Sequence, residues 1–174
     1  MTTSTPTTVL ASRADVIDQA VPLASGHPLH ALRRERPKIV DATQGSYEAM
    51  FAAGVQGISV VERLAVALHA SQLSRAAHLA AHYRQRLVDE GADPQALLNA
   101  PGARLATILD FTGKLIARPL DGDKTSVEAL LAVGLSTPAI VALGQLIAFL
   151  SYQVRVVAGL QAMADATPAT GEAA

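Results

Sequence analysis

The sequence contains no cysteine, which excludes disulfides, thiol nucleophiles, CxxC redox chemistry and thiolate-bound zinc or iron–sulfur sites. It has no tryptophan, and its aromatic residues are three Tyr and three Phe. Half of the 174 residues are nevertheless apolar, with Ala and Leu the most frequent. Because Ala and Leu favour helices, whereas aromatic and β-branched residues favour strands, this composition predicts an all-α protein.

The chain also has no excess of either charge and no long apolar run. Its formal net charge is −1, whereas nucleic-acid-binding proteins usually carry a basic excess. The longest apolar stretch, residues 138–150, is interrupted by Gln145 and is shorter than the roughly 20 residues that cross a membrane. We therefore expect a core helix buried on most sides, no nucleic-acid or membrane partner, and, because the first residues do not resemble a secretory signal, a cytoplasmic location.

Apolar spacing and capping residues predict about seven helices in one domain, residues 12–163, between disordered tails at residues 1–11 and 164–174. Residues 21–30 contain two prolines and a glycine and are expected to form a loop. Capping boxes are expected at Ser59–Glu62 and Thr125–Glu128. The expected helices lie at residues 12–20, 37–53, 60–72, 74–90, 103–118, 126–133 and from 138 to about 163, and a short helix is expected to begin at residue 94.

Several short patterns follow one another in the C-terminal half. They are ILDFTGKL (108–115), VEALLAVGLS (127–136) and FLSYQVRVVAGL (149–160). With residues 60–87 as a helix pair and residues 37–53 as the helix before it, the chain resembles the alkylhydroperoxidase D / carboxymuconolactone decarboxylase superfamily. The resemblance implies an all-α alkylhydroperoxidase D-like domain with a long C-terminal helix, assembled as a trimer or hexamer. It also implies a pocket at the helix pair, where two cysteines of peroxidase members reduce a hydroperoxide while a Glu and a His relay protons.

This chain departs from the family at that pocket, and two registers remain open. With Leu73-Ser74-Arg75 on the family's LNG, the two Cys positions, the His position and the Glu position hold Ala76, Leu79, Tyr83 and Leu64. A shift by one residue places there Arg75, His78, His82 and Arg63, with Glu62 adjacent. Neither register supplies a thiol, so the resemblance implies the scaffold without a thiol-peroxidase cycle.

The candidate site residues are His82, His78 and Glu62, with His69 and Tyr83 as further candidates. His78 and His82 are four residues apart and share a helix face, so they could line the remaining pocket, serve only the structure, or chelate a metal if His69 joined them. Glu62 is either the proton-relay acid or only a capping residue. We assign no cofactor and no metal ligand.

A basic run precedes the predicted helix at residues 37–53. It consists of Arg33, Arg34, Arg36 and Lys38. Such a run could bind a carboxylate, although a solvated face or a set of subunit salt bridges is the simpler use.

Three functions fit these features. The favoured one is an oligomeric binding or accessory protein without thiol-peroxidase activity, which partners a small organic ligand or an active peroxidase paralogue. The alternative is a non-redox enzyme of the decarboxylase kind, in which His82 is the base and His78 or Glu62 assists on a small organic acid or lactone. The third is a structural oligomer whose pocket is filled by side chains. The apolar C-terminal helix predicts a homo-oligomer (dimer, trimer or hexamer) in each case.

Overall fold

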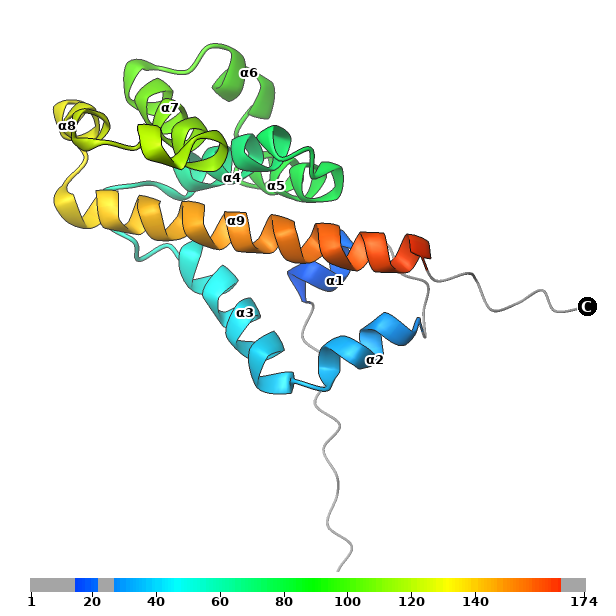
Figure 1. The fold of residues 1–174 in the computed structure, drawn as a ribbon. Helices are drawn as coiled ribbons and strands as arrows, with labels where there is room; N and C mark the ends of the chain where they lie inside the picture. The colour runs from blue at the N-terminus through cyan, green and yellow to red at the C-terminus, as the bar shows by residue number, and fades with distance from the viewer. Residues whose placement is uncertain (1–14, 22–26, 167–174) are drawn as a thin grey trace, which may run out of the picture.

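The structure is a computed structural model that describes residues 15–21 and 27–166 (Figure 1). Within these residues it consists of helices and contains no strand, which confirms the predicted all-α class and the long C-terminal helix. The helices are α1 (Val16–Ala20), α2 (Pro28–Arg34), α3 (Pro37–Met50), α4 (Val60–Leu73), α5 (Ala77–Asp89), α6 (Pro94–Asn99), α7 (Ala103–Ala117), a 3₁₀ turn at Pro119–Asp121, α8 (Lys124–Ala132) and α9 (Thr137–Ala166).

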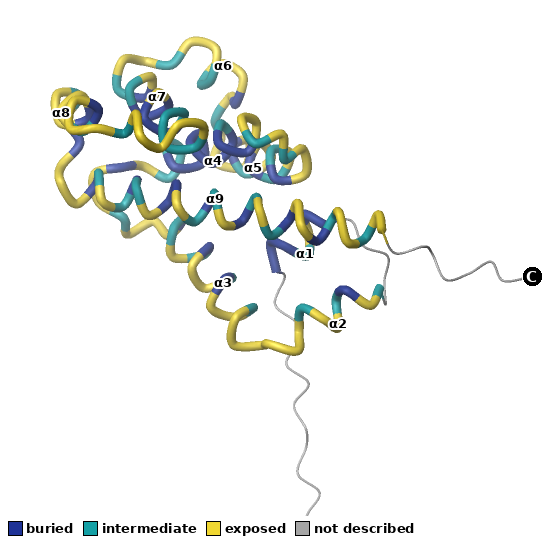
Figure 2. Tube along the Cα trace, in the orientation of Figure 1, coloured by how far each residue is buried: buried dark blue, intermediate teal, exposed yellow. Residues whose placement is uncertain are grey.

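Helix α4 is the centre of the core, where it packs against α5, α7 and α9 (Figure 2). Its buried residues are Arg63, Leu64, Ala65, Val66, Ala67, Leu68, Ala70 and Ser71. A helix that is apolar on nearly every side must be covered on nearly every side. The alanines among these residues leave room for three neighbouring helices to approach.

Helix α9 lies across the bundle and contacts α1, α3, α4, α7 and α8. Its buried residues recur every three or four positions: Ala139, Leu143, Leu146, Ile147, Leu150, Gln153, Val157 and Leu160. The expectation that this helix is buried on most sides is therefore wrong, because only one face is covered and Val141 on another face is 55% exposed. By length and hydropathy alone α9 could span a membrane, a test that core helices of soluble proteins also meet.

Three predicted boundaries also differ from the structure. Helix α2 occupies part of the predicted loop at 21–30, because Pro28 suits a first helical turn and the His27 Nδ1 accepts a hydrogen bond from the Leu29 amide at 3.2 Å. Helix α8 begins before the predicted Thr125–Glu128 capping box, because Asp123 caps it by accepting from the Ser126 amide at 3.0 Å. Helix α9 extends to Ala166, past the predicted tail boundary, and the predicted tail at 1–11 lies outside the described residues.

The joint between α4 and α5 has a special backbone conformation. Arg75 has a φ of 56°, in the left-handed region that glycine normally occupies after a helix. The Ala76 amide then donates to the Ser71 carbonyl at 2.9 Å, which closes the end of α4. This tight joint makes α4 and α5 a closely packed pair and fixes the start of α5.

Candidate functional site

The candidate site lies between α3 and α5. Tyr47 on α3 reaches across to α5, where His82 and Arg86 are one helical turn apart and therefore share a face. The Tyr47 hydroxyl oxygen is 2.7 Å from His82 Nε2 and 2.8 Å from Arg86 Nη1. A phenol, an imidazole and a guanidinium thus meet at a single oxygen atom.

The hydrogen-bond donors assign one of the two bonds of this cluster. A guanidinium can only donate, so Arg86 donates to the Tyr47 oxygen, which keeps one acceptor site and its own proton for the bond with His82 Nε2. Either neutral tautomer of His82 makes that bond: Nε2 accepts the Tyr47 proton when the imidazole proton is on Nδ1, and donates to the Tyr47 oxygen when the proton is on Nε2. Burial lowers the pKa of His82, and the charge of Arg86 lowers it further, which agrees with a neutral ring. Burial raises the pKa of Tyr47, so its hydroxyl remains protonated, although Arg86 opposes that shift.

Arg86 gives the site a positive charge. Its guanidinium carbon lies 4.8 Å from the ring centroid of Phe51 and 5.5 Å from that of Tyr47. Within the part of the chain that the structure describes, no carboxylate lies within ion-pair distance of Arg86. After burial itself, the charge of Arg86 is the cause that lowers the pKa of Arg63, so two guanidinium groups influence this region. A half-buried cation with aromatic walls and no acidic partner is suited to an anion.

Tyr83, although adjacent to His82, belongs to the core. Its side chain is fully buried, and its hydroxyl donates to Gln153 Oε1 on α9 at 2.5 Å. Burial raises the pKa of Tyr83 far above its usual value, so the phenol does not ionise. The rings of His82 and Tyr83 meet edge to face at 5.1 Å, so Tyr83 supports the imidazole without sharing its hydrogen bonds.

The three candidate histidines do not meet. The His78 side chain is exposed and makes no hydrogen bond to a described residue, whereas that of His82 points toward α3. His69 lies on α4 and lines a different pocket of about 430 Å³ against α7, beside Gly113 and Lys114. Among residues 15–21 and 27–166, no three His, Asp or Glu side chains come close enough to hold a metal ion. The open alternative of a metal chelated by these histidines therefore has no support in the geometry.

Glu62 serves the structure. It forms the predicted capping box, in which the Glu62 amide donates to Ser59 Oγ at 3.1 Å and the Ser59 amide donates to Glu62 Oε2 at 2.8 Å. Its other oxygen accepts from Arg104 Nε at 2.7 Å, and Arg104 also donates to the Gly57 carbonyl at 2.6 Å. Burial alone would raise the pKa of Glu62, but the hydrogen bonds from Arg104 and Ser59 lower it. Both oxygens are engaged in these bonds, and no described hydrogen bond joins Glu62 to His82, so its role as an assisting acid stays a prediction.

Sequence reasoning identified neither Arg86 nor Tyr47 as a site residue. The spacing of His82 and Arg86 on one helix was a usable signal, because residues four apart share a face. That Tyr47 joins them depends on how α3 packs against α5, which no local pattern specifies.

The lowered histidine pKa values predict a pH-dependent stability. Burial lowers the pKa values of His69 and His82 below 6.5 in the folded protein, so near that pH the unfolded chain binds more protons. The contribution of these two histidines to the free energy of unfolding is fully present above about pH 6.5. It is lost as the pH falls through their lowered pKa values in the folded protein. Urea unfolding at about pH 7.5 and about pH 5.5 should give a smaller free energy of unfolding at the lower pH. His82→Gln should reduce that difference, whereas an unchanged difference would contradict the assignment; His78→Gln is the exposed control.

No family model and no curated protein matches the chain. Among solved structures, the chain is similar to the crystal structure of an uncharacterized peroxidase-related protein from Silicibacter sp. TM1040, with a TM-score of 0.65 and 18% sequence identity. The match covers 70% of this chain and 68% of that chain. The likeness shows that this chain has the all-α fold of a peroxidase-related protein.

Proposed function

We propose that this chain is a cysteine-less relative of the alkylhydroperoxidase D / carboxymuconolactone decarboxylase superfamily, without thiol-peroxidase activity, that binds a small organic anion at Tyr47, His82 and Arg86. The observation that carries the proposal is the Arg86 guanidinium, which has no carboxylate partner among the described residues and lies beside a neutral imidazole and a phenol. Arg86 attracts the anion and binds it through the guanidinium N–H groups that Tyr47 does not occupy, while the uncharged phenol and imidazole form the neighbouring wall.

The absence of thiol chemistry follows from the sequence in either register. The left-handed backbone at Arg75 supports the register that aligns this residue with the glycine of the family's LNG, because glycine is favoured in that conformation. In that register the two cysteine positions hold Ala76, at the start of α5, and Leu79, in the core. Neither side chain can form a thiolate or a disulfide.

A second candidate function is acid–base catalysis on the bound anion, because His82 Nε2 lies 2.7 Å from the Tyr47 hydroxyl oxygen and accepts its proton in the tautomer that is protonated on Nδ1. In such a step the ligand loses a proton to the Tyr47 oxygen while the Tyr47 proton passes to His82 Nε2. The products are a deprotonated ligand and an imidazolium, so one proton enters the pair and none is lost. Arg86 stabilises the negative charge that passes through the phenol oxygen.

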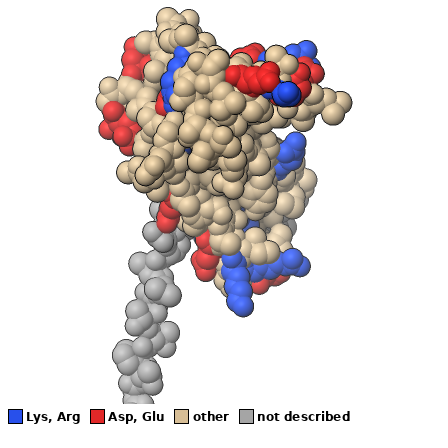
Figure 3. All heavy atoms as spheres, turned by 90° about the vertical axis from the view of Figure 1, so that its left-hand side faces the viewer, with Lys and Arg blue, Asp and Glu red and all other residues tan. Residues whose placement is uncertain are grey.

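The homo-oligomer is part of the same proposal, and it is supported by apolar side chains on the surface. Leu120, Leu131 and Val141 are exposed, and they lie on the 3₁₀ turn, α8 and the first turns of α9. Figure 3 looks at that end of the molecule, where most of the visible surface is uncharged. An uncharged surface of this kind suits contact with a second copy of the chain.

Calorimetric titration with benzoate, an aromatic carboxylate, tests the proposed anion site. Arg86→Gln should weaken binding about tenfold or more, because a charged hydrogen bond to the carboxylate is lost. Arg84→Gln, an exposed arginine on the same helix, should leave the affinity unchanged. The wild-type protein should not consume cumene hydroperoxide in the presence of dithiothreitol. Equal affinity in Arg86→Gln, absence of binding to the wild type, or hydroperoxide turnover would contradict the proposal.

His82→Asn separates the two candidate functions. If the site only binds, this variant changes benzoate affinity and no ligand is converted by the wild type. If the site catalyses proton transfer, the wild type exchanges an acidic C–H of a small keto acid with deuterium, and His82→Asn lowers the exchange rate. The exchange is followed by proton NMR, and Arg86→Gln should raise the apparent KM for the keto acid.

A further inference from the structure

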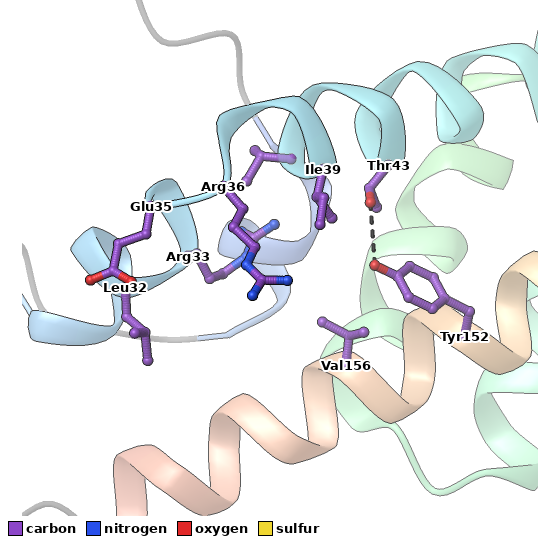
Figure 4. Close-up of a pocket in the computed structure, with 9 residues that line it drawn as sticks. Leu32, Arg33, Glu35, Arg36, Ile39, Thr43, Tyr152 and Val156 are labelled. Carbon is purple, nitrogen blue, oxygen red and sulfur yellow. Dashed lines mark hydrogen bonds between the residues drawn. The ribbon is translucent and has the colours of Figure 1, made fainter.

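A second pocket lies between the α2–α3 corner and α9, and it does not include the Tyr47 cluster. It has a volume of about 380 Å³ and opens to solvent. Figure 4 shows its lining, which is contributed by three helices. The residues that matter for the argument are Leu32, Arg36, Ile39, Thr43, Tyr152 and Val156.

The basic run at this corner separates into paired and unpaired arginines. Arg33 and Arg34 both form ion pairs with Asp18, and Arg33 Nη2 also pairs with Asp15 at 3.1 Å. Arg36 forms no ion pair or hydrogen bond through its side chain to a described residue. In Figure 4 its guanidinium extends toward α9, while the carboxylate of Glu35 lies toward α2. Arg36 is therefore the cation in this pocket that is available to a ligand.

The remaining walls divide the pocket into an apolar part and a polar end. Ile39 and Val156 face one another across the gap between α3 and α9, whereas Leu32 lies on the other side of Arg36. Beyond them the Thr43 and Tyr152 hydroxyls form a hydrogen bond of 3.3 Å. Each hydroxyl oxygen retains acceptor capacity, and one proton of the pair remains free to donate. The order along the pocket is thus cation, hydrocarbon wall and hydroxyl pair.

We propose that this pocket binds a small amphipathic carboxylate. The carboxylate accepts two hydrogen bonds from the planar guanidinium of Arg36, and the hydrocarbon part lies against Ile39 and Val156. A hydroxyl or carbonyl at the far end of the ligand meets Thr43 and Tyr152. This inference does not depend on the proposed function, because Arg86 and His82 do not line the pocket.

Calorimetric titration with octanoate tests the proposal, because octanoate supplies the carboxylate and the chain without the distal polar group. The wild type should bind octanoate, and Arg36→Gln should weaken binding at least about tenfold. Arg36→Lys should give an intermediate affinity, since it retains the charge but loses the two-pronged geometry. Octanol, which lacks the charge, should bind more weakly than octanoate. Arg84→Gln is the control for loss of an exposed arginine.

Two further variants test which part of the ligand meets the hydroxyl pair and which of the two proposed sites binds the ligand. Tyr152→Phe should weaken binding of the ω-hydroxy derivative of octanoate relative to octanoate itself, because only the derivative reaches the hydroxyl pair. The loss of octanoate affinity caused by Arg36→Gln should also be found in an Arg86→Gln background, where the Tyr47 site no longer contributes, so failure of the Tyr47 site and failure of this pocket give different results. The inference is overturned if octanoate does not bind, if Arg36→Gln binds it as the wild type does, or if octanol binds equally well. It is also overturned if Ile39→Glu dissociates an oligomer, because a second copy then occupies the pocket.

Discussion

Replacing Arg63 with methionine is expected to lower the free energy of unfolding by about 3 kcal/mol, because a buried charged donor that serves three carbonyl groups is removed. The Arg63 side chain is 2% exposed. It donates to the carbonyl oxygens of Met50, of Ala52 at 2.8 Å and of Ser59 at 3.3 Å. The Met50 carbonyl belongs to the last turn of α3, where backbone oxygens have no helical partner and the helix dipole favours a cation. Arg63 thus joins the end of α3 to the start of α4.

The measurement is urea unfolding followed by the far-ultraviolet circular dichroism of the helices. Arg63→Lys should recover part of the loss, because an ammonium keeps the charge but does not span three carbonyls. Arg155→Met, on the exposed surface of α9, is the matched control, since its hydrogen bond is made to the Ser151 carbonyl of its own helix. A stability of Arg63→Met within about 0.5 kcal/mol of the wild type would contradict the role assigned to these bonds.

Replacing Tyr83 with phenylalanine is expected to cost about 2 kcal/mol, although the ring itself is retained. The lost hydroxyl is the described partner of Gln153 Oε1, and Gln153 is fully buried between α9 and α5. Among the residues that the structure describes, the Gln153 Nε2 already has no hydrogen-bond partner. The variant would therefore leave the whole buried amide without a hydrogen bond to any of these residues.

The double variant Tyr83→Phe with Gln153→Leu should be more stable than Tyr83→Phe alone, because it removes both polar groups together. Four proteins complete the cycle: the wild type, the two single variants and the double variant. Their unfolding free energies should give a coupling energy above about 1 kcal/mol. If the double variant is less stable than the sum of the two single losses, the buried pair does not act as the unit described.

The capping residues in the sequence were sufficient to predict where some helices begin and insufficient for others. The start of α4 could be predicted because Ser59 and Glu62 are three residues apart and satisfy one another within a single turn. Helix α2 was missed because its cap is the imidazole of His27, a residue that is not a usual capping residue. The start of α8 was misplaced because Asp123 and Thr125 are both good caps, and only the structure shows that Asp123 accepts the bond.

The candidate site was predicted only in part, for a different reason. His82 was identified from its place on a helix, but its hydrogen-bond partner lies on another helix, 35 positions away in sequence. The pairing of helix faces depends on the burial of many side chains at once, so periodicity within α5 cannot specify it. For the same reason, the sequence could not show that His69 lies apart from His82. The two share neither a pocket nor a hydrogen bond.

The central place of α4 has a consequence for how the chain is made. Ribosomes produce α4 well before α9, and until α9 arrives the part of α4 that it covers in the native state remains accessible. The nascent chain therefore presents an apolar helix to the cell for the time needed to synthesise the segment between them. Transiently exposed apolar surface is prone to aggregation, so the face of α4 that awaits α9 is an exposed apolar surface of the unfinished chain.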